Sequence, residues 1–214
     1  MKTKIFSRYG WIVLFAYFGL AYIVEEVSII AAVCMVAPVI TSFFWGRKWC
    51  GHFCPRGSFL NSIPRKHLIR TPRFLASKFI RIAFFVLLMS AFAIQIYMSD
   101  RSVISIGSIL FRMVVVTTIF AVILGLIFGS RRWCTVCPMG TMAHIVSRIS
   151  YFQKRAPRIV FLSDSCAACN MCGKKCPMKI NPLSFQKKGV VDHPDCIKCN
   201  TCVYSCPTKK IGIA

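Results

Sequence analysis

The chain has 214 residues, of which 56% are hydrophobic and 16% charged, and its mean hydropathy of +0.62 excludes an ordinary soluble domain. The 28 Lys and Arg residues outnumber the 6 Asp and Glu residues and give a net charge of +22. Long apolar runs explain this charge better than nucleic-acid binding does, because basic residues collect on the cytoplasmic side of membrane helices. No small-residue cleavage site follows the first apolar run, so a cleavable signal peptide is not expected.

Four transmembrane helices are predicted, arranged as two duplicated helical hairpins. A helix needs about 20 apolar residues to cross a bilayer, and roughly 17 is the lower limit. The run 9–45 is therefore long enough for two short crossings with a turn at Glu25 and Glu26. The predicted helices are Tyr9–Val24, Ser28–Trp45, Phe79–Met98 and Ile104–Phe128. Most basic residues then lie at the ends that carry the termini, which places both termini in the cytoplasm at a prokaryotic cytoplasmic membrane.

One motif occurs twice, each time directly after an apolar run. "GRKWCGHFCPRGS" spans residues 46–58, and "GSRRWCTVCPMGT" spans residues 129–141. An even number of helices separates the two loops, so both emerge on the cytoplasmic face. Repeated halves commonly meet about an axis along the membrane normal, and we therefore expect the loops to face each other. Trp49 and Trp133 are expected at the level of the lipid headgroups.

The C-terminal part carries two runs of the form C-x2-C-x2-C-x3-C-P. This is the spacing of bacterial ferredoxins with two [4Fe–4S] clusters, where the fourth Cys of each run binds the other cluster. The predicted ligands are Cys166, Cys169, Cys172 and Cys206 for the first cluster and Cys196, Cys199, Cys202 and Cys176 for the second. Zinc is the alternative, but zinc sites usually need two C-x2-C pairs and do not explain two complete runs with both prolines.

Lysines dominate the charge of this module, with Asp192 and Asp195 as its acidic residues. Positive charge near a cluster favours the more negative, reduced state. It also suits an acidic cytoplasmic electron carrier or anionic lipid headgroups as a partner. The general excess of positive charge on the cytoplasmic side is the alternative explanation.

Four further cysteines lie in the duplicated loops: Cys50, Cys54, Cys134 and Cys137. If the loops face each other, four thiolates could hold a third centre, either [2Fe–2S] or [4Fe–4S]. The alternative is structural, with free thiols in tight Cys-Pro turns that pack the module against the helices. The remaining cysteine, Cys34, is expected to be a small apolar residue within a helix.

The histidines bear on haem and on proton transfer. His52, His67, His144 and His193 lie outside the predicted helix cores, so a membrane haem held by two histidines is not expected. His52 and His144 lie close to the duplicated motifs and are candidates for proton handling beside a quinone headgroup. An ordinary surface imidazole is the alternative for each.

These features together resemble the NapH/NosR-type membrane ferredoxins, and most closely the quinol dehydrogenase membrane component of periplasmic nitrate reductase systems. "CGHFCP" matches the C-x3-C-P motif of that family, whereas "CTVCP" is one residue shorter. The resemblance covers nearly the whole chain. It implies membrane electron transfer between the quinone pool and other iron–sulfur or cytochrome subunits.

The predicted organisation is an α-helical membrane domain (1–146), a linker (147–165) and a cytoplasmic ferredoxin module (166–214). The predicted function is an electron-transfer subunit of an oxidoreductase complex rather than a complete enzyme, with quinone as a possible further ligand and no nucleic-acid partner. The alternative function is a maturation or regulatory protein that uses Cys50, Cys54, Cys134 and Cys137 to reduce a metal or a disulfide. A passive membrane anchor is a third hypothesis.

Overall fold

The computed structural model of the chain describes residues 2–63, 77–100, 102–149, 157–162, 166 and 168–214. Its long helices are α1 (Lys2–Ile23), α2 (Ile30–Trp45), α5 (Lys78–Tyr97) and α6 (Val103–Phe128), and the 3-10 helix η1 (Glu25–Ile29) joins α1 to α2. Short helices follow α2 and α6: α3 (Lys48–His52), α4 (Pro55–Ser62), α7 (Trp133–Val136) and α8 (Pro138–Ile149). The predicted order of two long helices and a motif, repeated once, is therefore present in the structure.

Three helical segments are long and apolar enough to cross a membrane: Glu25–Trp45, Lys78–Tyr97 and Val103–Phe128. Most of their residues are not buried inside the protein, as contact with lipid would require for an apolar surface. The apolar part of α1, Tyr9–Ile23, is shorter. The prediction of four spans is thus supported for three helices, and a crossing by α1 stays a prediction.

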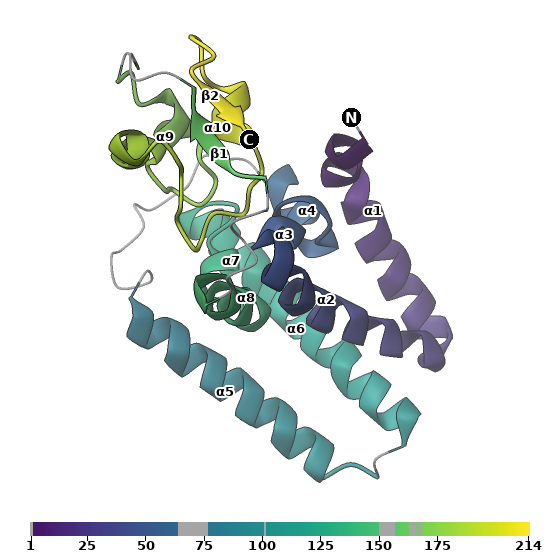
Figure 1. Cartoon of the computed structure of the whole chain (residues 1–214). Coiled ribbons are helices and arrows are strands. Elements are labelled where there is room, and N and C mark those ends of the chain that lie inside the picture. Colours follow the sequence, from purple (N-terminus) through teal and green to yellow (C-terminus); the bar gives the residue numbers. More distant parts are fainter. Residues whose placement is uncertain (1, 64–76, 101, 150–156, 163–165, 167) are drawn as a thin grey trace.

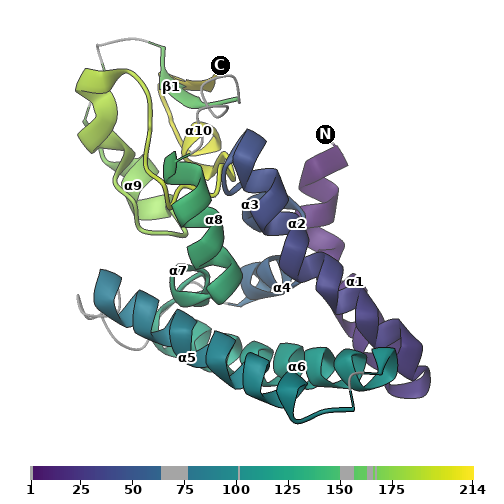
Figure 2. The ribbon, with the colours of Figure 1, turned by 60° about the horizontal axis from the view of Figure 1, so that its bottom comes forward.

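The long helices form two hairpins, α1 with α2 and α5 with α6 (Figure 1). Both hairpin turns lie at the end of the molecule away from the C-terminal module, and the N-terminus lies toward the module (Figures 1 and 2). The hairpins also contact each other, because η1 and α2 both pack against α6. This arrangement brings both motifs to the same end of the bundle, as predicted.

The C-terminal module is built on a two-stranded antiparallel sheet. Strand β1 (Ile159–Phe161) pairs with β2 (Ile211–Ile213), and Ile159 lies opposite Ile213. Between the strands lie α9 (Met171–Lys175), the 3-10 helix η4 (Pro182–Lys188) and α10 (Thr201–Tyr204). The segment 147–165, predicted to be a linker, therefore contributes the end of α8 and strand β1, because β1 finds its partner far along the chain.

The two cysteine runs of the module have the same backbone conformation. Six non-glycine residues have positive φ, and they fall at equivalent places in the two runs: Ala168 and Lys198, Asn170 and Asn200, Lys179 and Lys209. Only Asn adopts this left-handed conformation readily, whereas Ala and Lys pay roughly 1–2 kcal/mol for it. Such strain is retained where the backbone must bend around a functional group.

One hydrophobic core joins the module to the helices. Leu60, Ala121 and Trp133 come from the helical part, and they pack with Met178 and Ile197 of the module. All five are at least 93% buried. The module therefore rests on the helices through a dry apolar contact rather than through exposed loops.

Candidate iron–sulfur sites

The second cysteine of each motif ends a loop and starts a helix. Pro55 begins α4 directly after Cys54, and Pro138 begins α8 directly after Cys137. Proline is favoured at the first position of a helix, since its fixed φ is helical and no amide hydrogen is needed there. Cys54 also caps α4, because its sulfur accepts a hydrogen bond of 3.4 Å from the Gly57 amide. The Cys-Pro sequence therefore holds each thiol at a helix N-terminus.

Two buried arginines cross between the motifs. Arg131 of the second motif donates from Nη1 to the carbonyl oxygen of Cys50 at 2.7 Å. Arg47 of the first motif donates from Nη2 to the carbonyl oxygen of Cys134 at 2.5 Å. These arginines precede their own Trp-Cys pairs at the same distance in sequence, so the contacts are equivalent in the two halves. The expected meeting of the two loops about a pseudo-two-fold axis is confirmed by this reciprocal pair.

A glycine in each motif makes room for the arginine from the other. A Cβ atom added at Gly57 would lie 2.4 Å from Nη1 of Arg131, and one added at Gly140 would lie 2.6 Å from Nη2 of Arg47. Each would also lie within about 3 Å of the carbonyl oxygen of the first cysteine of its own motif. The repeated Cys-Pro-x-Gly sequence is thus explained by the close approach of a guanidinium group.

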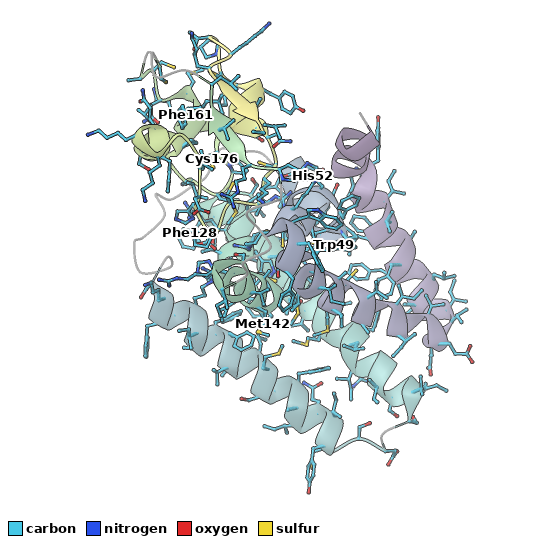
Figure 3. The ribbon with its side chains drawn as sticks, in the orientation of Figure 1. Trp49, His52, Phe128, Met142, Phe161 and Cys176 are labelled. Carbon is cyan, nitrogen blue, oxygen red and sulfur yellow. The ribbon has the colours of Figure 1, made fainter. Side chains whose placement is uncertain are left out.

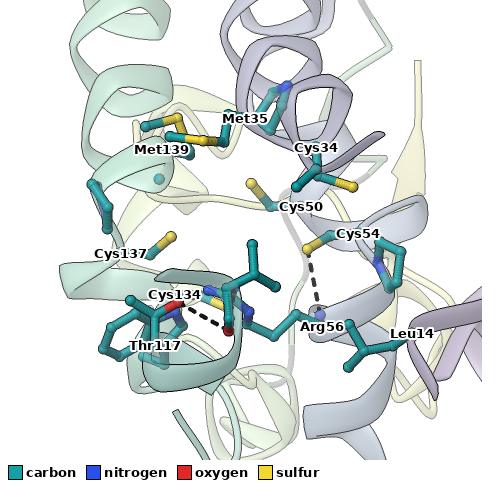
Figure 4. Close-up of a pocket in the computed structure, with 18 of the residues that line it drawn as sticks. Leu14, Cys34, Met35, Cys50, Cys54, Arg56, Thr117, Cys134, Cys137 and Met139 are labelled. Carbon is teal, nitrogen blue, oxygen red and sulfur yellow. Dashed lines mark hydrogen bonds between the residues drawn. The ribbon is translucent and has the colours of Figure 1, made fainter. Parts of the chain in front are cut away.

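The four loop cysteines line one cavity of about 180 Å³. The sulfur atoms of Cys50, Cys54 and Cys137 point toward the middle of this cavity, and Cys134 lies on its lower side (Figure 4). Cys34 also lines the cavity, but its sulfur points away from the other thiols (Figure 4). The duplicated loops therefore bring together the four cysteines that the sequence singled out and leave Cys34 apart.

Burial shifts the acidity of these thiols. Burial, with a smaller contribution from the neighbouring thiols of Cys50 and Cys134, raises the pKa of Cys54 to about 12. Burial also raises the pKa of Cys50, against the opposing effect of Arg47. Neutral thiols with raised pKa values are poor nucleophiles. Bound metal reverses this preference, because a coordinating thiol loses its proton to the metal.

Unpartnered donors surround the cavity and test whether an iron–sulfur cluster fits it. Among the described residues, the buried side-chain nitrogens without a hydrogen-bond partner are Nε of Arg47, Nδ1 of His52, Nε of Arg132 and Nε1 of Trp133, all within the duplicated motifs. Two of these residues, Arg47 and Trp133, line the cavity itself. A buried N–H group is costly when it lacks an acceptor, and cluster sulfurs are such acceptors. The donors and the four thiols fit an iron–sulfur cluster.

Within the part of the chain that the structure describes, no three His, Cys, Asp or Glu side chains converge closely enough to hold one metal ion. A zinc site needs its ligands at about 2.0–2.3 Å from a common centre, so the loop cysteines as placed do not form one.

A second, smaller cavity lies inside the ferredoxin module. It has a volume of about 20 Å³, and its lining includes Cys176, Cys196, Cys199 and Cys202. Burial, with smaller contributions from the thiols of Cys196, Cys199 and Cys176, raises the pKa of Cys202 to about 12. The structure therefore brings together the ligand set predicted for the second cluster, including the crossover of Cys176 from the first run.

The predicted ligands of the first cluster lie in the same module, where Cys172 shares a hydrophobic core with Cys202. Cys172 is buried, and the nearby thiols of Cys166 and Cys169 contribute to its raised pKa after the larger effect of burial. Cys206 packs in the same hydrophobic core as Cys172. Slight burial raises the pKa of Cys206, but hydrogen bonds led by that from Thr208 lower it overall. This half of the module is the more exposed, since Cys169 is exposed and Cys206 is only partly buried.

Asp195 links the module to three elements of the helical part. Its Oδ1 atom accepts from Nη1 of Arg47 at 2.7 Å and from Nη2 of Arg81, at the start of α5, also at 2.7 Å. His144 of α8 contacts the same oxygen through Nδ1 at 2.9 Å. Burial alone raises the pKa of Asp195, but the hydrogen bonds from His144 and Arg81 and the charge of Arg47 hold it well below its usual range. Asp195 is thus a buried anion that directly precedes Cys196.

The histidines proposed to handle protons do not line the cavity of the loop cysteines. His144 faces Asp195 instead. His52 lies on α3 beside Trp49, where the module meets the helices (Figure 3), and burial lowers its pKa. His193 accepts a hydrogen bond from the Asp195 amide, and His67 lies outside the described residues.

The two motif tryptophans differ from the prediction and from each other. Trp133 is only 1% exposed and packs edge-on against Phe84, with ring centroids 5.7 Å apart. Its expected position among lipid headgroups is therefore wrong, because the second motif lies under the ferredoxin module. Trp49 is partly exposed and stacks on Phe53 at 5.5 Å.

Sequence reasoning missed the residues that join the sites. Arg47 and Arg131 had a signal, since an arginine stands at the same place before both Trp-Cys pairs. Asp195 had a weaker one, as one of 6 acidic residues in a basic chain and the neighbour of a predicted ligand. Gly51 carried none. A Cβ there would lie 2.1 Å from the carbonyl oxygen of Ile197, so only glycine fits where the first motif meets the module.

Comparisons with known proteins match the same regions. The family model of a 4Fe-4S binding domain matches residues 27–72 and 110–158, one stretch in each half of the duplication. The model of a 4Fe-4S dicluster domain matches residues 165–211. No solved structure matches the chain significantly.

Two curated proteins are similar over most of the chain. "Putative electron transport protein YccM" of Escherichia coli K12 is 30% identical over 197 residues, which cover 80% of this chain and 54% of that protein. "Uncharacterized protein MJ0749" of Methanocaldococcus jannaschii is 23% identical over 184 residues, which cover 82% of this chain and 68% of that protein. The chain thus spans about half of the first relative and two thirds of the second. With the matched domains and the cysteine geometry, it is an iron–sulfur protein that carries a 4Fe-4S binding domain and a C-terminal 4Fe-4S dicluster domain.

Proposed function

We propose that the chain is a membrane electron-transfer subunit with three iron–sulfur centres, which passes electrons between a cytoplasmic partner and the quinone pool. One observation carries the proposal: the thiols of Cys50, Cys54, Cys134 and Cys137 line one cavity beside the second ferredoxin site. Cys50 and Cys137 of the loops pack against the same core cluster as Cys176 and Cys199 of the module. The first ferredoxin cluster, the second cluster and the loop-cysteine centre would then lead, in this order, from the module to the membrane helices.

Charge supports a third centre at the loop cysteines. Arg47 and Arg131 are 1% and 2% exposed; among the described residues Arg47 pairs with the carboxylate of Asp195, whereas Arg131 bonds the neutral side chain of Asn61. A buried cation is costly unless an anion lies near it. A cluster bound by four thiolates carries net negative charge and would supply that anion. When bound, it would store and release single electrons.

The protein groups around this centre have defined tasks. The Cys-Pro turns hold Cys54 and Cys137 at the starts of α4 and α8. The crossed arginines hold the two loops at one separation, and Trp133 closes the cavity with an apolar ring. The cavity lining is mostly apolar, and a low local dielectric strengthens each N–H contact to a bound anion.

The membrane side of the cavity supports the quinone part of the proposal. The cavity continues between α1, α2 and α6, where its lining is almost entirely apolar. Three polar side chains line the cavity here: Tyr17, whose hydroxyl donates to the Ser28 carbonyl at 3.1 Å, Arg56 and Thr117. Ligand sites of this kind combine apolar walls with a few polar groups that orient the ligand. A quinone arriving from the bilayer fits such a site. The resemblance to quinol dehydrogenase components also supports a quinone as the ligand.

The partner side of the proposal rests on the module. Its more exposed half holds Cys169 and Cys206, and exposed lysines lie on the module at Lys174, Lys175 and Lys209. An acidic electron carrier or another redox subunit would be attracted to this surface. Both termini would lie in the cytoplasm. The relative named as an electron transport protein agrees with this role.

The alternative, a maturation protein with reactive thiols, finds less support. Cys50 and Cys54 are partly buried and have raised pKa values, which disfavours the thiolate needed for exchange.

Iron and acid-labile sulfide analysis of anaerobically purified protein, with EPR of the reduced form, tests the proposal. Three centres predict about 10 or 12 irons per chain, and two [4Fe–4S] clusters alone give about 8. Cys50→Ala and Cys134→Ala should lower the count to about 8, as two remaining clusters require. Cys34→Ala is the matched control, because Cys34 lines the same cavity but points away from the other thiols. A wild-type count of about 8 would refute the third centre.

A further inference from the structure

Arg47 touches three parts of the molecule at once. It belongs to the first motif, its Nη2 donates to the carbonyl oxygen of Cys134 in the second motif, and its Nη1 donates to Asp195 in the module. Cys134 and Asp195 lie 87 and 148 positions after Arg47 in the sequence. One buried guanidinium therefore connects both halves of the loop-cysteine site to the residue that precedes a ferredoxin ligand.

Arg131 is the residue of the second motif that corresponds to Arg47, so the contacts of the two arginines can be compared. It makes the equivalent contact across the motifs, to the Cys50 carbonyl, but its Nε donates at 2.9 Å to the neutral side chain of Asn61. Both arginines thus join the two loops, and of the pair only Arg47 makes a bond to the module. The pseudo-two-fold symmetry of the motifs is broken where the module docks.

The backbone at this junction leaves no space for adjustment. Asp195, Cys196 and Ile197 are consecutive, and the carbonyl oxygen of Ile197 would lie only 2.1 Å from a Cβ atom added at Gly51. Ile197 is 2% exposed and lies in the core shared with the helices. Asp195 is also held by Arg81 and His144, so elements α5 and α8 fix it from other sides.

We propose that Arg47 is a positioning residue for electron transfer between the second ferredoxin cluster and the centre at the loop cysteines. Through Asp195 it holds the loop that carries Cys196 at one separation and orientation from Cys50 and Cys134. Electron transfer between two centres depends steeply on their separation, so a lock at the junction sets the rate. The inference rests on the proposed third centre and adds the residue that couples that centre to the module.

The variants that test this separate position from charge. Arg47→Lys keeps the positive charge but loses the planar fork that bonds Asp195 and Cys134 together. Asp195→Asn weakens the lock from the module side without altering either motif. Arg131→Gln is the matched control, because it removes a crossed contact of the motifs and leaves the bond to Asp195.

The measurements use the full-length protein in detergent, with iron content determined for each variant. The first readout is the magnetic interaction between the reduced second cluster and the reduced loop centre in EPR. The second is the rate at which the loop centre is reduced after rapid photoreduction of the module. We expect Arg47→Lys and Asp195→Asn to weaken the interaction and to slow this rate by about tenfold or more, since misplaced reacting groups lose rate steeply. For molecules that retain the loop centre, Arg131→Gln should keep the interaction.

The outcomes are distinct. An unchanged interaction and rate in Arg47→Lys and Asp195→Asn, at full iron content, would overturn the positioning role and leave the third centre standing. An equal loss in Arg131→Gln would also overturn it, because the effect would then belong to the packing of the motifs. If Arg47→Lys fails to fold, Asp195→Asn decides alone. A wild-type protein with about 8 irons would remove the third centre itself and with it this inference.

Discussion

The guanidinium group of Arg131 donates a hydrogen bond to the carbonyl oxygen of Cys50 at 2.7 Å, and Arg47 makes the equivalent bond to Cys134. This exchange explains why the chain carries its motif twice. The arginine of each loop needs a hydrogen-bond acceptor and space for its guanidinium group. The carbonyl oxygen and the glycine of the other loop provide them, so neither loop can form this structure alone. The duplicated sequence thus encodes two halves of one buried site.

Gly57→Ala and Gly140→Ala should disrupt the loop-cysteine site and spare the ferredoxin module. A Cβ at Gly57 would lie 2.4 Å from Arg131 Nη1 and 3.1 Å from the Cys50 oxygen, and the backbone oxygen cannot move freely. Iron analysis should show loss of the third centre, with two clusters retained. Gly19→Ala is the control, since a Cβ there meets nothing within 4 Å. Full iron in both motif variants would contradict the crossed-arginine geometry.

Gly51→Ala should loosen the contact between the module and the helices. The added Cβ would lie 2.1 Å from the Ile197 carbonyl oxygen, and both atoms belong to backbone regions held by the core. Overpacking of this kind costs about 1–3 kcal/mol. Hydrogen exchange of the peptide that contains residues 194–200 should become faster. Protection equal to that of the wild type would show that the junction is not tightly packed.

The two motif tryptophans should differ in their contribution to stability. Trp133→Ala should destabilise the protein by about 3–5 kcal/mol, because it empties a fully buried site in the shared core. Trp49→Ala should cost clearly less, since Trp49 is only partly buried. Chemical denaturation in detergent measures both. Similar losses for the two variants would mean that Trp49 is buried in the assembled protein.

Cysteine modification should distinguish electron transfer from thiol chemistry. In iron-loaded protein, a lipid-soluble maleimide should modify Cys34, which is exposed on α2, and leave the cysteines of the motifs and the module protected as ligands. Mass spectrometry of labelled peptides reads the result. Rapid labelling of Cys50, Cys54, Cys134 and Cys137 in the same sample would favour the maturation function instead.

Docking of the module should not change between pH 8 and pH 5. Folding lowers the pKa of Asp195 below its ordinary value of about 3.9. Its stabilising contribution is therefore complete above that ordinary value and is lost only as pH falls through the lower value in the folded protein. The EPR interaction between the second cluster and the loop centre should stay constant over this range. A loss with a midpoint above pH 5 would show that another group controls docking.

Local pattern was enough to predict much of this protein. The length of an apolar run decides whether a helix can span a membrane, and α2, α5 and α6 end within a few residues of the predicted limits. Ligand spacing is likewise local, so both cysteine runs could be assigned to clusters before any contact was known. Even the meeting of the two motifs followed from counting helices between them.

Only the tertiary structure decided what lies between the sites. The bonds from Arg47 to Cys134 and to Asp195 span 87 and 148 residues, and β1 pairs with a strand at the other end of the module. Such pairs depend on how helices and loops pack in three dimensions, and no periodicity records them. The same packing buries Trp133 but leaves Trp49 at the edge, although their local sequences are nearly the same. Sequence thus determined which residues can bind clusters, and packing determined which of them face one another.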